Sequence, residues 1–136
     1  MSVCFILRRK VFIMNILLWV LQIVLGVYFV GIGYMHFNIP INLPDAMGWM
    51  YELSTELHYF SGAAEILGGI GLIVPGLLKI QARLTPLAAF GLALLMLGAA
   101  LYHLQRGELQ NIPTNIVLIA VCSFLGYSRL RKYSLG

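Results

Sequence analysis

The feature that most constrains this chain is a set of four long apolar segments separated by short polar stretches. They cover residues 11–33, 60–78, 84–104 and 112–127. Each is close to the roughly 20 residues that an α-helix needs to cross a bilayer core. The chain is 60% hydrophobic and only 10% charged, whereas an average soluble domain is about 25% charged. We therefore expect its 136 residues to form one all-α domain, an integral membrane four-helix bundle.

The stretch between the first two apolar segments, residues 34–59, is too polar to cross a membrane, and Pro40 and Pro44 interrupt it. After Pro44, apolar and polar side chains recur with the period of a helix. We predict a short amphipathic helix at 46–57 that lies on the membrane interface, with Asp45 as its N-cap. Its apolar stripe consists of Ala46, Trp49, Met50, Leu53 and Leu57.

Small residues recur along one face of the third and of the fourth apolar segment. These faces consist of Gly91, Leu95, Gly98 and Tyr102, and of Asn115, Ile119, Cys122 and Gly126. The second segment is also rich in glycine and alanine. Because lipid provides no hydrophobic drive for helix association, small residues favour it by letting backbones approach closely. We expect these faces to pack against neighbouring helices.

The basic residues predict the orientation of the bundle. Eight of the nine Lys and Arg residues lie in the N-terminal stretch, the loop between the second and third segments, and the C-terminal stretch. Only Arg106 lies on the other side, together with the acidic residues Asp45, Glu52, Glu56 and Glu108. Short loops follow the positive-inside rule, so both termini are predicted to be cytoplasmic. Basic clusters at membrane edges attract anionic lipid, and we expect no nucleic-acid partner despite the net charge of +4.

The two cysteines, Cys4 and Cys122, are far apart and form no CxxC pair. The sequence also contains no haem-attachment motif and no nucleotide-binding loop. This pattern argues against an autonomous dithiol–disulfide enzyme. We expect Cys122 to be a small packing residue.

Glu65 lies inside the second apolar segment, in the run FSGAAEILGGIGLIVPGLL. A carboxyl group at membrane depth is costly, so it usually faces a bundle interior. Ser61 and His58 lie on the same helical face as Glu65. The predicted topology brings further polar and aromatic residues to the same outer half of the bundle, namely Tyr28, His36, Tyr102, His103 and Asn115.

Three roles for Glu65 fit this placement. In the first, Tyr or Asn partners hydrogen-bond Glu65 and lock the bundle. In the second, a pocket open to the outer leaflet holds a small molecule, and Glu65 handles protons together with a histidine. A quinone headgroup would suit such a site, because its reduction takes up protons. In the third, His36, His58, His103 and Glu65 bind zinc or iron, although their spacing matches no recognised metal motif, so no metal ligands are assigned.

Four stretches resemble those of DoxX-like integral membrane proteins, in order and in spacing. They are GIGYMHF, YFSGAAEILGGIGLIVPGLL, LTPLAAFGLALLMLGAALYHLQRGE and NIVLIAVCSFLGYSR, and together they cover most of the chain from Gly31 to Arg129. The resemblance implies a four-helix membrane bundle in the bacterial inner membrane. By motif position, it also points to the polar residues His36, Glu65, His103, Glu108 and Asn115.

The family takes its name from the membrane subunit of a thiosulfate–quinone oxidoreductase, and related branches include assembly helpers. The resemblance therefore implies either a redox-linked, quinone-associated subunit or a non-enzymatic subunit that assembles or stabilises a membrane complex. The partners would be the lipid bilayer and other membrane subunits or a soluble redox protein. For the first alternative, Glu65 and His103 are the candidate catalytic residues. The candidate ligand-binding residues are Tyr28, Tyr34, His36, Glu65, Tyr102, His103 and Asn115.

Overall fold

The computed structural model describes residues 2–131 and 134–135, so that Lys132, one of the basic C-terminal residues, lies outside the described part. The elements in chain order are α1 (Ser2–Phe37), η1 (Asp45–Tyr51), α2 (Thr55–Leu78), α3 (Leu84–Gln105), η2 (Leu109–Asn111) and α4 (Ile112–Arg131). The described residues contain no strand. All four α-helices are long and apolar enough to cross a membrane, which confirms the predicted all-α class with four apolar spans.

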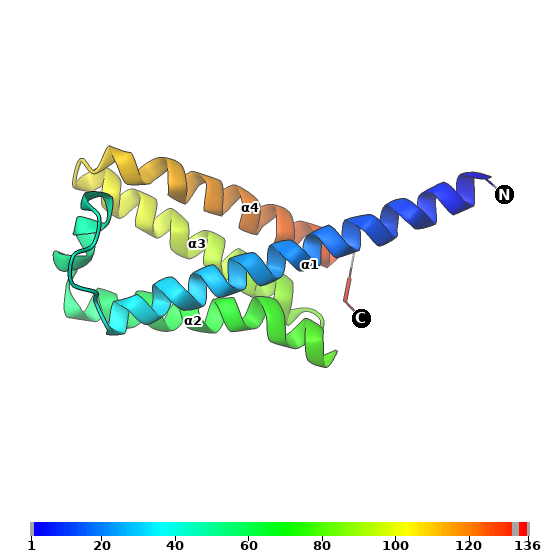
Figure 1. Ribbon diagram of the computed structural model, residues 1–136, viewed down its shortest axis with the longest axis horizontal. Helices are drawn as coiled ribbons and strands as arrows, with labels where there is room; N and C mark the ends of the chain where they lie inside the picture. The colour runs from blue at the N-terminus through cyan, green and yellow to red at the C-terminus, as the bar shows by residue number, and fades with distance from the viewer. Residues whose placement is uncertain (1, 132–133, 136) are drawn as a thin grey trace.

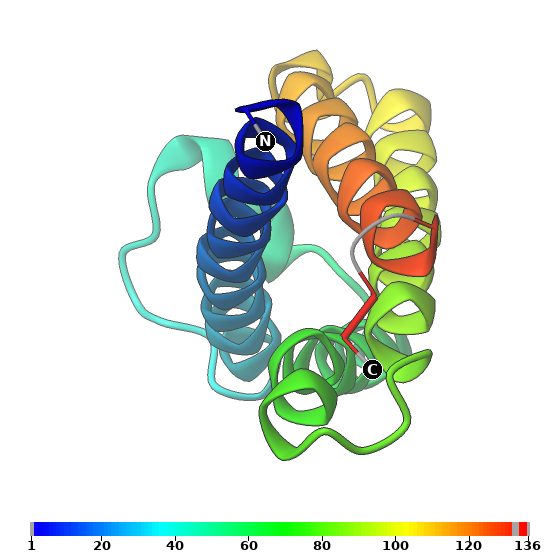
Figure 2. The same cartoon turned by 90° about the vertical axis from the view of Figure 1, so that its right-hand side faces the viewer.

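The four helices are arranged as two antiparallel pairs. Helix α1 packs mainly on α2, and α3 packs mainly on α4. Figure 1 shows the two pairs close together at the end that carries both termini and apart at the opposite end, where η1 bridges them. We call these the terminal end and the loop end of the bundle. Figure 2 shows the bundle from its terminal end, with both termini toward the viewer.

Two reciprocal glycine pairs hold α1 and α2 close together. A Cβ atom built on Gly69 would lie 2.6 Å from the Gly26 carbonyl oxygen, and one on Gly33 would lie 2.8 Å from the Gly62 carbonyl oxygen. Gly26 and Gly33 are seven residues apart, as are Gly62 and Gly69. The pairs therefore form one stripe along the interface, and only hydrogen at these positions allows the backbones to approach so closely.

Helix α1 is longer than one membrane crossing. Its 36 residues, at a rise of about 1.5 Å each, span roughly 54 Å, compared with a hydrocarbon core of roughly 30 Å. Residues 3–13 are all exposed, and Figure 1 shows this part of α1 projecting beyond the bundle at the terminal end. The projecting turns carry the basic residues Arg8, Arg9 and Lys10.

A buried polar cluster joins α1, α2 and α4 near the terminal end. Gln22 Nε2 donates a hydrogen bond of 2.7 Å to the Leu72 carbonyl, while Gln22 Oε1 accepts one from Arg129 Nε. Arg129 also donates to Asn15 Oδ1, and its guanidinium lies 5.6 Å from the centre of the Trp19 ring. Because every one of these partners is polar or aromatic, Arg129 can be buried at the end of a membrane helix.

The predicted single interfacial helix at 46–57 is not confirmed. The structure has a 3₁₀ helix at Asp45–Tyr51, with Pro44 rather than Asp45 at its N-cap. Ser54 then starts a new helix, because its hydroxyl accepts a hydrogen bond of 3.3 Å from Leu57 N. Leu57 consequently belongs to α2, which begins five residues before the expected span.

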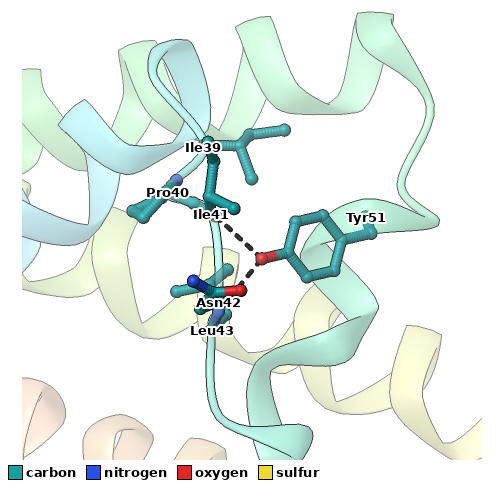
Figure 3. Close-up of a pocket in the computed structure, with 6 residues that line it drawn as sticks. All are labelled: Ile39, Pro40, Ile41, Asn42, Leu43 and Tyr51. Atoms are coloured by element: carbon teal, nitrogen blue, oxygen red, sulfur yellow. Dashed lines mark hydrogen bonds between the residues drawn. The ribbon is translucent and has the colours of Figure 1, made fainter.

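The loop before η1 is fixed by one phenol group. Tyr51 Oη donates a hydrogen bond of 2.8 Å to the Pro40 carbonyl and accepts one of 3.0 Å from Leu43 N. Figure 3 shows both bonds and the shallow depression that residues 39–43 form with Tyr51. Both hydrogen-bonding functions of the hydroxyl are thus used to hold the backbone of this loop.

Candidate functional site

A cavity of about 570 Å³ lies at the loop end, between the two helix pairs. All four helices and η1 contribute to its lining. Its aromatic and polar lining residues are Tyr28, His36, Trp49, Phe60, Ser61, Glu65, Tyr102, His103, Gln105 and Asn115. A volume of this size is within the range of small-molecule sites.

The cavity exists because α2 and α3 diverge toward the loop end. Near the terminal end, Cβ atoms built on Gly68 and Gly71 would meet Leu92 and Ala88 of α3 at 2.5 and 2.8 Å. Nearer the loop end, a Cβ built on Gly98 would meet nothing within 4 Å. The same two helices are therefore tightly packed at one end and separated at the other.

This finding corrects the expected packing of the third segment. Gly91, Leu95, Gly98 and Tyr102 do share one face, as the spacing indicated, but all four line the cavity, although Leu95 also packs against the hydrophobic core. The spacing of these residues placed them on one face of the helix, but it could not show whether another helix covers that face. The corresponding face of α4 does pack, since a Cβ on Gly126 would lie 3.0 Å from the Phe90 ring.

One wall of the cavity faces the surroundings of the bundle. Phe60 of α2 and Leu94 of α3 line the cavity and are 66% and 70% exposed. Exposed apolar side chains on membrane helices face lipid tails. The cavity therefore has a lateral opening on the side where α2 and α3 carry these exposed residues.

The loop-end side of the cavity is covered by η1. Met50 is fully buried, and the Trp49 ring lies between His36 and His103, with ring centroids 5.8 and 5.3 Å away. Beyond this cover, Arg106 pairs with Glu52, which follows η1 directly. The connection between α1 and α2 is thereby tied to the end of α3.

Glu65 is 4% exposed, and its nearest titratable partner is His36. Glu65 Oε2 lies 3.5 Å from His36 Nε2. His36 Nδ1 lies 2.8 Å from His58 Nδ1, and His58 Nε2 lies 2.9 Å from the Met50 carbonyl oxygen. These groups form a continuous row from the middle of α2 through α1 to η1.

The carbonyl at one end of this row fixes where the protons lie. A carbonyl oxygen only accepts, so His58 Nε2 carries a proton, and in neutral His58 the Nδ1 atom is then an acceptor. His36 Nδ1 must therefore donate to it, which leaves His36 Nε2 with a lone pair directed at Glu65. The geometry thus assigns the tautomer of both rings from hydrogen-bond counting alone.

Two buried polar atoms that line the cavity are without a hydrogen-bond partner among the described residues. They are Glu65 Oε2 on α2 and Asn115 Nδ2 on α4. Leaving a buried polar group unsatisfied costs about 1–3 kcal/mol. The two atoms come from different helix pairs, so that a molecule between the pairs can satisfy both.

Six of the seven predicted ligand-binding residues line the cavity: Tyr28, His36, Glu65, Tyr102, His103 and Asn115. Tyr34 does not, and it is 60% exposed because it lies on the opposite face of α1 from His36. The two proposed catalytic side chains, Glu65 and His103, have different partners. Glu65 lies beside His36, while His103 Nδ1 is 2.6 Å from Glu108 Oε2.

Sequence reasoning missed two contributions to the site. Trp49 was predicted only as part of the apolar stripe of the interfacial helix, and it lines the cavity. The Met50 carbonyl, which orients His58, belongs to the backbone and leaves no signal in the sequence. His58 was placed on the correct face of α2, although its contact with His36 depends on how α1 and α2 are paired.

The third hypothesis, a metal site, is not supported by the arrangement of the donors. Within residues 2–131 and 134–135, no group of three or more His, Cys, Asp or Glu side chains converges as metal ligands do. The Nδ1 atoms of His36 and His58 face each other at hydrogen-bond distance. Each of these nitrogens is therefore already occupied by the other ring.

The sequence model of the DoxX-like family matches residues 20–125, which is most of the chain. The protein belongs to the DoxX-like family. Comparisons with curated proteins and with solved structures gave no match. Membership of the DoxX-like family and the four apolar helices together identify an integral membrane protein.

Proposed function

We propose that this DoxX-like protein is a redox-linked membrane subunit that holds a quinone-like amphiphile in the loop-end cavity. The observation that carries the proposal is the pair of unpartnered polar atoms, Glu65 Oε2 and Asn115 Nδ2, on the wall of an otherwise largely apolar cavity. Such convergence of a few polar groups in an apolar cavity is the usual feature of a ligand site.

The two polar atoms fit a ring that carries two carbonyl groups. Asn115 Nδ2 donates a hydrogen bond to one carbonyl oxygen, and protonated Glu65 donates to the other. Tyr28, Phe60 and Tyr102 provide aromatic walls for a flat ring. An apolar tail leaves through the lateral opening between α2 and α3 into lipid, because the side chains there are apolar and exposed.

The proposal places both termini on the cytoplasmic side of the bacterial inner membrane and the cavity in the outer half. The basic residues of α1, of the connection between α2 and α3, and of the end of α4 support this orientation. A second membrane subunit or a soluble redox protein on the loop-end side would supply or remove the electrons.

Binding of a short-chain quinone to purified protein in nanodiscs tests the proposal. Glu65→Met removes the donor but keeps a side chain of similar length, and it is expected to weaken binding several-fold, since a neutral hydrogen bond contributes about 0.5–1.5 kcal/mol. Gly98→Phe places a ring on the open wall, where an added Cβ meets nothing within 4 Å, and it is expected to abolish binding.

Gly31→Phe is the matched control, because Gly31 also has open space around it but does not line the cavity. It is expected to bind like the natural protein. If all three variants bind quinone equally, or the natural protein binds none, the cavity is not a quinone site. Co-purification of a stoichiometric membrane partner would then favour the assembly or stabilising role.

A further inference from the structure

We infer that His36 and His58 form a proton relay that connects Glu65, in the middle of the bundle, with the loop end. This inference deepens the proposed function and rests on it, since the relay serves the same carboxyl group that contacts the ligand. The observation that carries it is the row of contacts from Glu65 to the Met50 carbonyl: 3.5 Å, 2.8 Å and 2.9 Å.

The row has two arrangements of protons that keep the same pairs of heavy atoms in contact. In the first, which describes the ligand-free protein, Glu65 is a neutral acid whose O–H is directed at His36 Nε2 across 3.5 Å, His36 Nδ1–H donates to His58 Nδ1, and His58 Nε2–H donates to the Met50 carbonyl. All three side chains are then neutral. Burial favours this arrangement at rest, because a buried charge is costly.

In the second arrangement, one proton has moved at each of two contacts. The Glu65 proton passes to His36 Nε2, and the His36 Nδ1 proton passes to His58 Nδ1. Glu65 becomes a carboxylate, His36 remains neutral with its proton on Nε2, and His58 becomes an imidazolium that still donates to the Met50 carbonyl. Proton number and total charge are conserved, and the His36–His58 and His58–Met50 contacts remain hydrogen bonds.

The relay therefore transfers one positive charge from Glu65 to His58, at the beginning of α2. Run in reverse, the imidazolium of His58 passes its Nδ1 proton to His36 Nδ1 while His36 Nε2 passes its proton to Glu65, which restores the neutral acid. The contact of 3.5 Å between Glu65 and His36 must shorten by roughly half an ångström for the transfer. The other titratable side chains that line the cavity are Tyr28, Tyr102 and His103, and His103 is paired with Glu108.

A conservative variant separates proton transfer from structure. In His58→Gln, the amide oxygen can accept from His36 and the amide N–H can donate to the Met50 carbonyl, so both hydrogen bonds have a replacement. The amide cannot take up a proton at neutral pH, so the relay is interrupted. His58→Gln is thus expected to keep the fold and the position of Glu65.

The experiment is infrared spectroscopy of ligand-free protein in nanodiscs at neutral pH. The carbonyl band of the Glu65 acid, identified by its loss in Glu65→Gln, shifts when the acid proton is replaced by deuterium. After transfer to D₂O, we expect this shift to be at least tenfold slower in His58→Gln than in the natural protein. Tyr34→Phe, a change on α1 outside both the row and the cavity, should exchange at the natural rate.

Two results would overturn the relay. One is an unchanged exchange rate in His58→Gln, which would mean that protons reach Glu65 through the cavity. The other is ¹⁵N NMR of the natural protein showing His58 Nε2 without a proton at rest. Neither result affects the quinone-binding measurement, which would fail independently if the proposed function were wrong.

Discussion

At the scale of single residues, several polar groups inside this bundle are held by a specific neighbour from another element. Gln22 of α1 contacts Leu72 of α2 and Arg129 of α4. His36 of α1 contacts His58 and Glu65 of α2. In lipid, no water replaces a lost partner. The two buried side-chain atoms left unpartnered beside the cavity, on Glu65 and Asn115, are therefore the strongest local indication of a ligand.

The pH dependence of the free energy of unfolding is expected to reveal the contacts of Glu108, which lies outside the apolar spans. The hydrogen bond from Arg106 Nε to Glu108, at 2.7 Å, holds the pKa of the Glu108 carboxyl below its usual value of 4.5. A carboxyl whose pKa is lowered on folding stabilises the protein above about pH 4.5, and this contribution is lost as the pH falls through the folded-state pKa. For such a partly exposed pair we expect about 0.5 kcal/mol.

Unfolding in detergent micelles between pH 3 and pH 7 measures this effect. The stability difference between the natural protein and Glu108→Gln should shrink toward zero at the acid end of the range. A difference that does not vary with pH would show that the Glu108 carboxylate contributes nothing through its charge.

At the scale of elements, two kinds of helix contact build the molecule. The α1–α2 contact is a tight backbone approach at glycine pairs, while the α2–α3 contact is tight only near the terminal end and opens into the cavity. The short η1 helix covers the loop end and contributes Trp49 and the Met50 carbonyl to the site. The α1–α2 interface is thus tightly packed, while the α2–α3 interface is open at the loop end.

Gly69→Ala tests the tight interface. A Cβ at this position would lie 2.6 Å from the Gly26 carbonyl oxygen, so α1 and α2 must move apart, and we expect a loss of about 1–3 kcal/mol of stability. Gly31→Ala is the control, with nothing within 4 Å of the added atom, and alanine's higher helix propensity should leave it neutral or more stable. Equal stabilities of the two variants in denaturant unfolding would contradict the close approach.

At the scale of the whole molecule, the two helix pairs form a wedge whose closed end carries both termini and whose open end contains the cavity (Figure 1). Apart from Arg106, the basic residues of the described part gather at the closed end, at the beginning of α1, after α2 and at the end of α4. An amphiphile in the open end would have its polar head under η1 and its tail in lipid. The orientation of the wedge in the membrane decides from which side the ligand site and the relay are reached.

The native cysteines offer a test of this orientation. Cys4 is exposed and Cys122 is buried, so a membrane-impermeant maleimide should react at Cys4 alone. We expect no labelling of intact cells and full labelling after permeabilisation, because the basic terminal end is predicted to be cytoplasmic. Cys4→Ser should abolish the signal, and labelling of Cys4 in intact cells would reverse the proposed topology.

The sequence by itself determined the four long apolar helices and the grouping of the polar residues at one end of the bundle. Both follow from local properties, because apolar length fixes a membrane span and the rise per residue fixes depth. Six of the seven predicted ligand-binding residues accordingly line one cavity. Tyr34 was misplaced because depth does not say which way a side chain points around its helix.

Only the tertiary structure decided which groups meet. The heptad face with Gly91 and Gly98 predicted close packing, yet it lines a cavity, because α2 and α3 diverge and no single-helix pattern encodes the angle between two helices. The partner of Glu65 is His36 rather than His103, since α1, not α3, lies against α2 along its length. The proton positions in the row depend on the Met50 carbonyl. Every residue carries such a backbone carbonyl, so its role is set only by its surroundings in the folded structure.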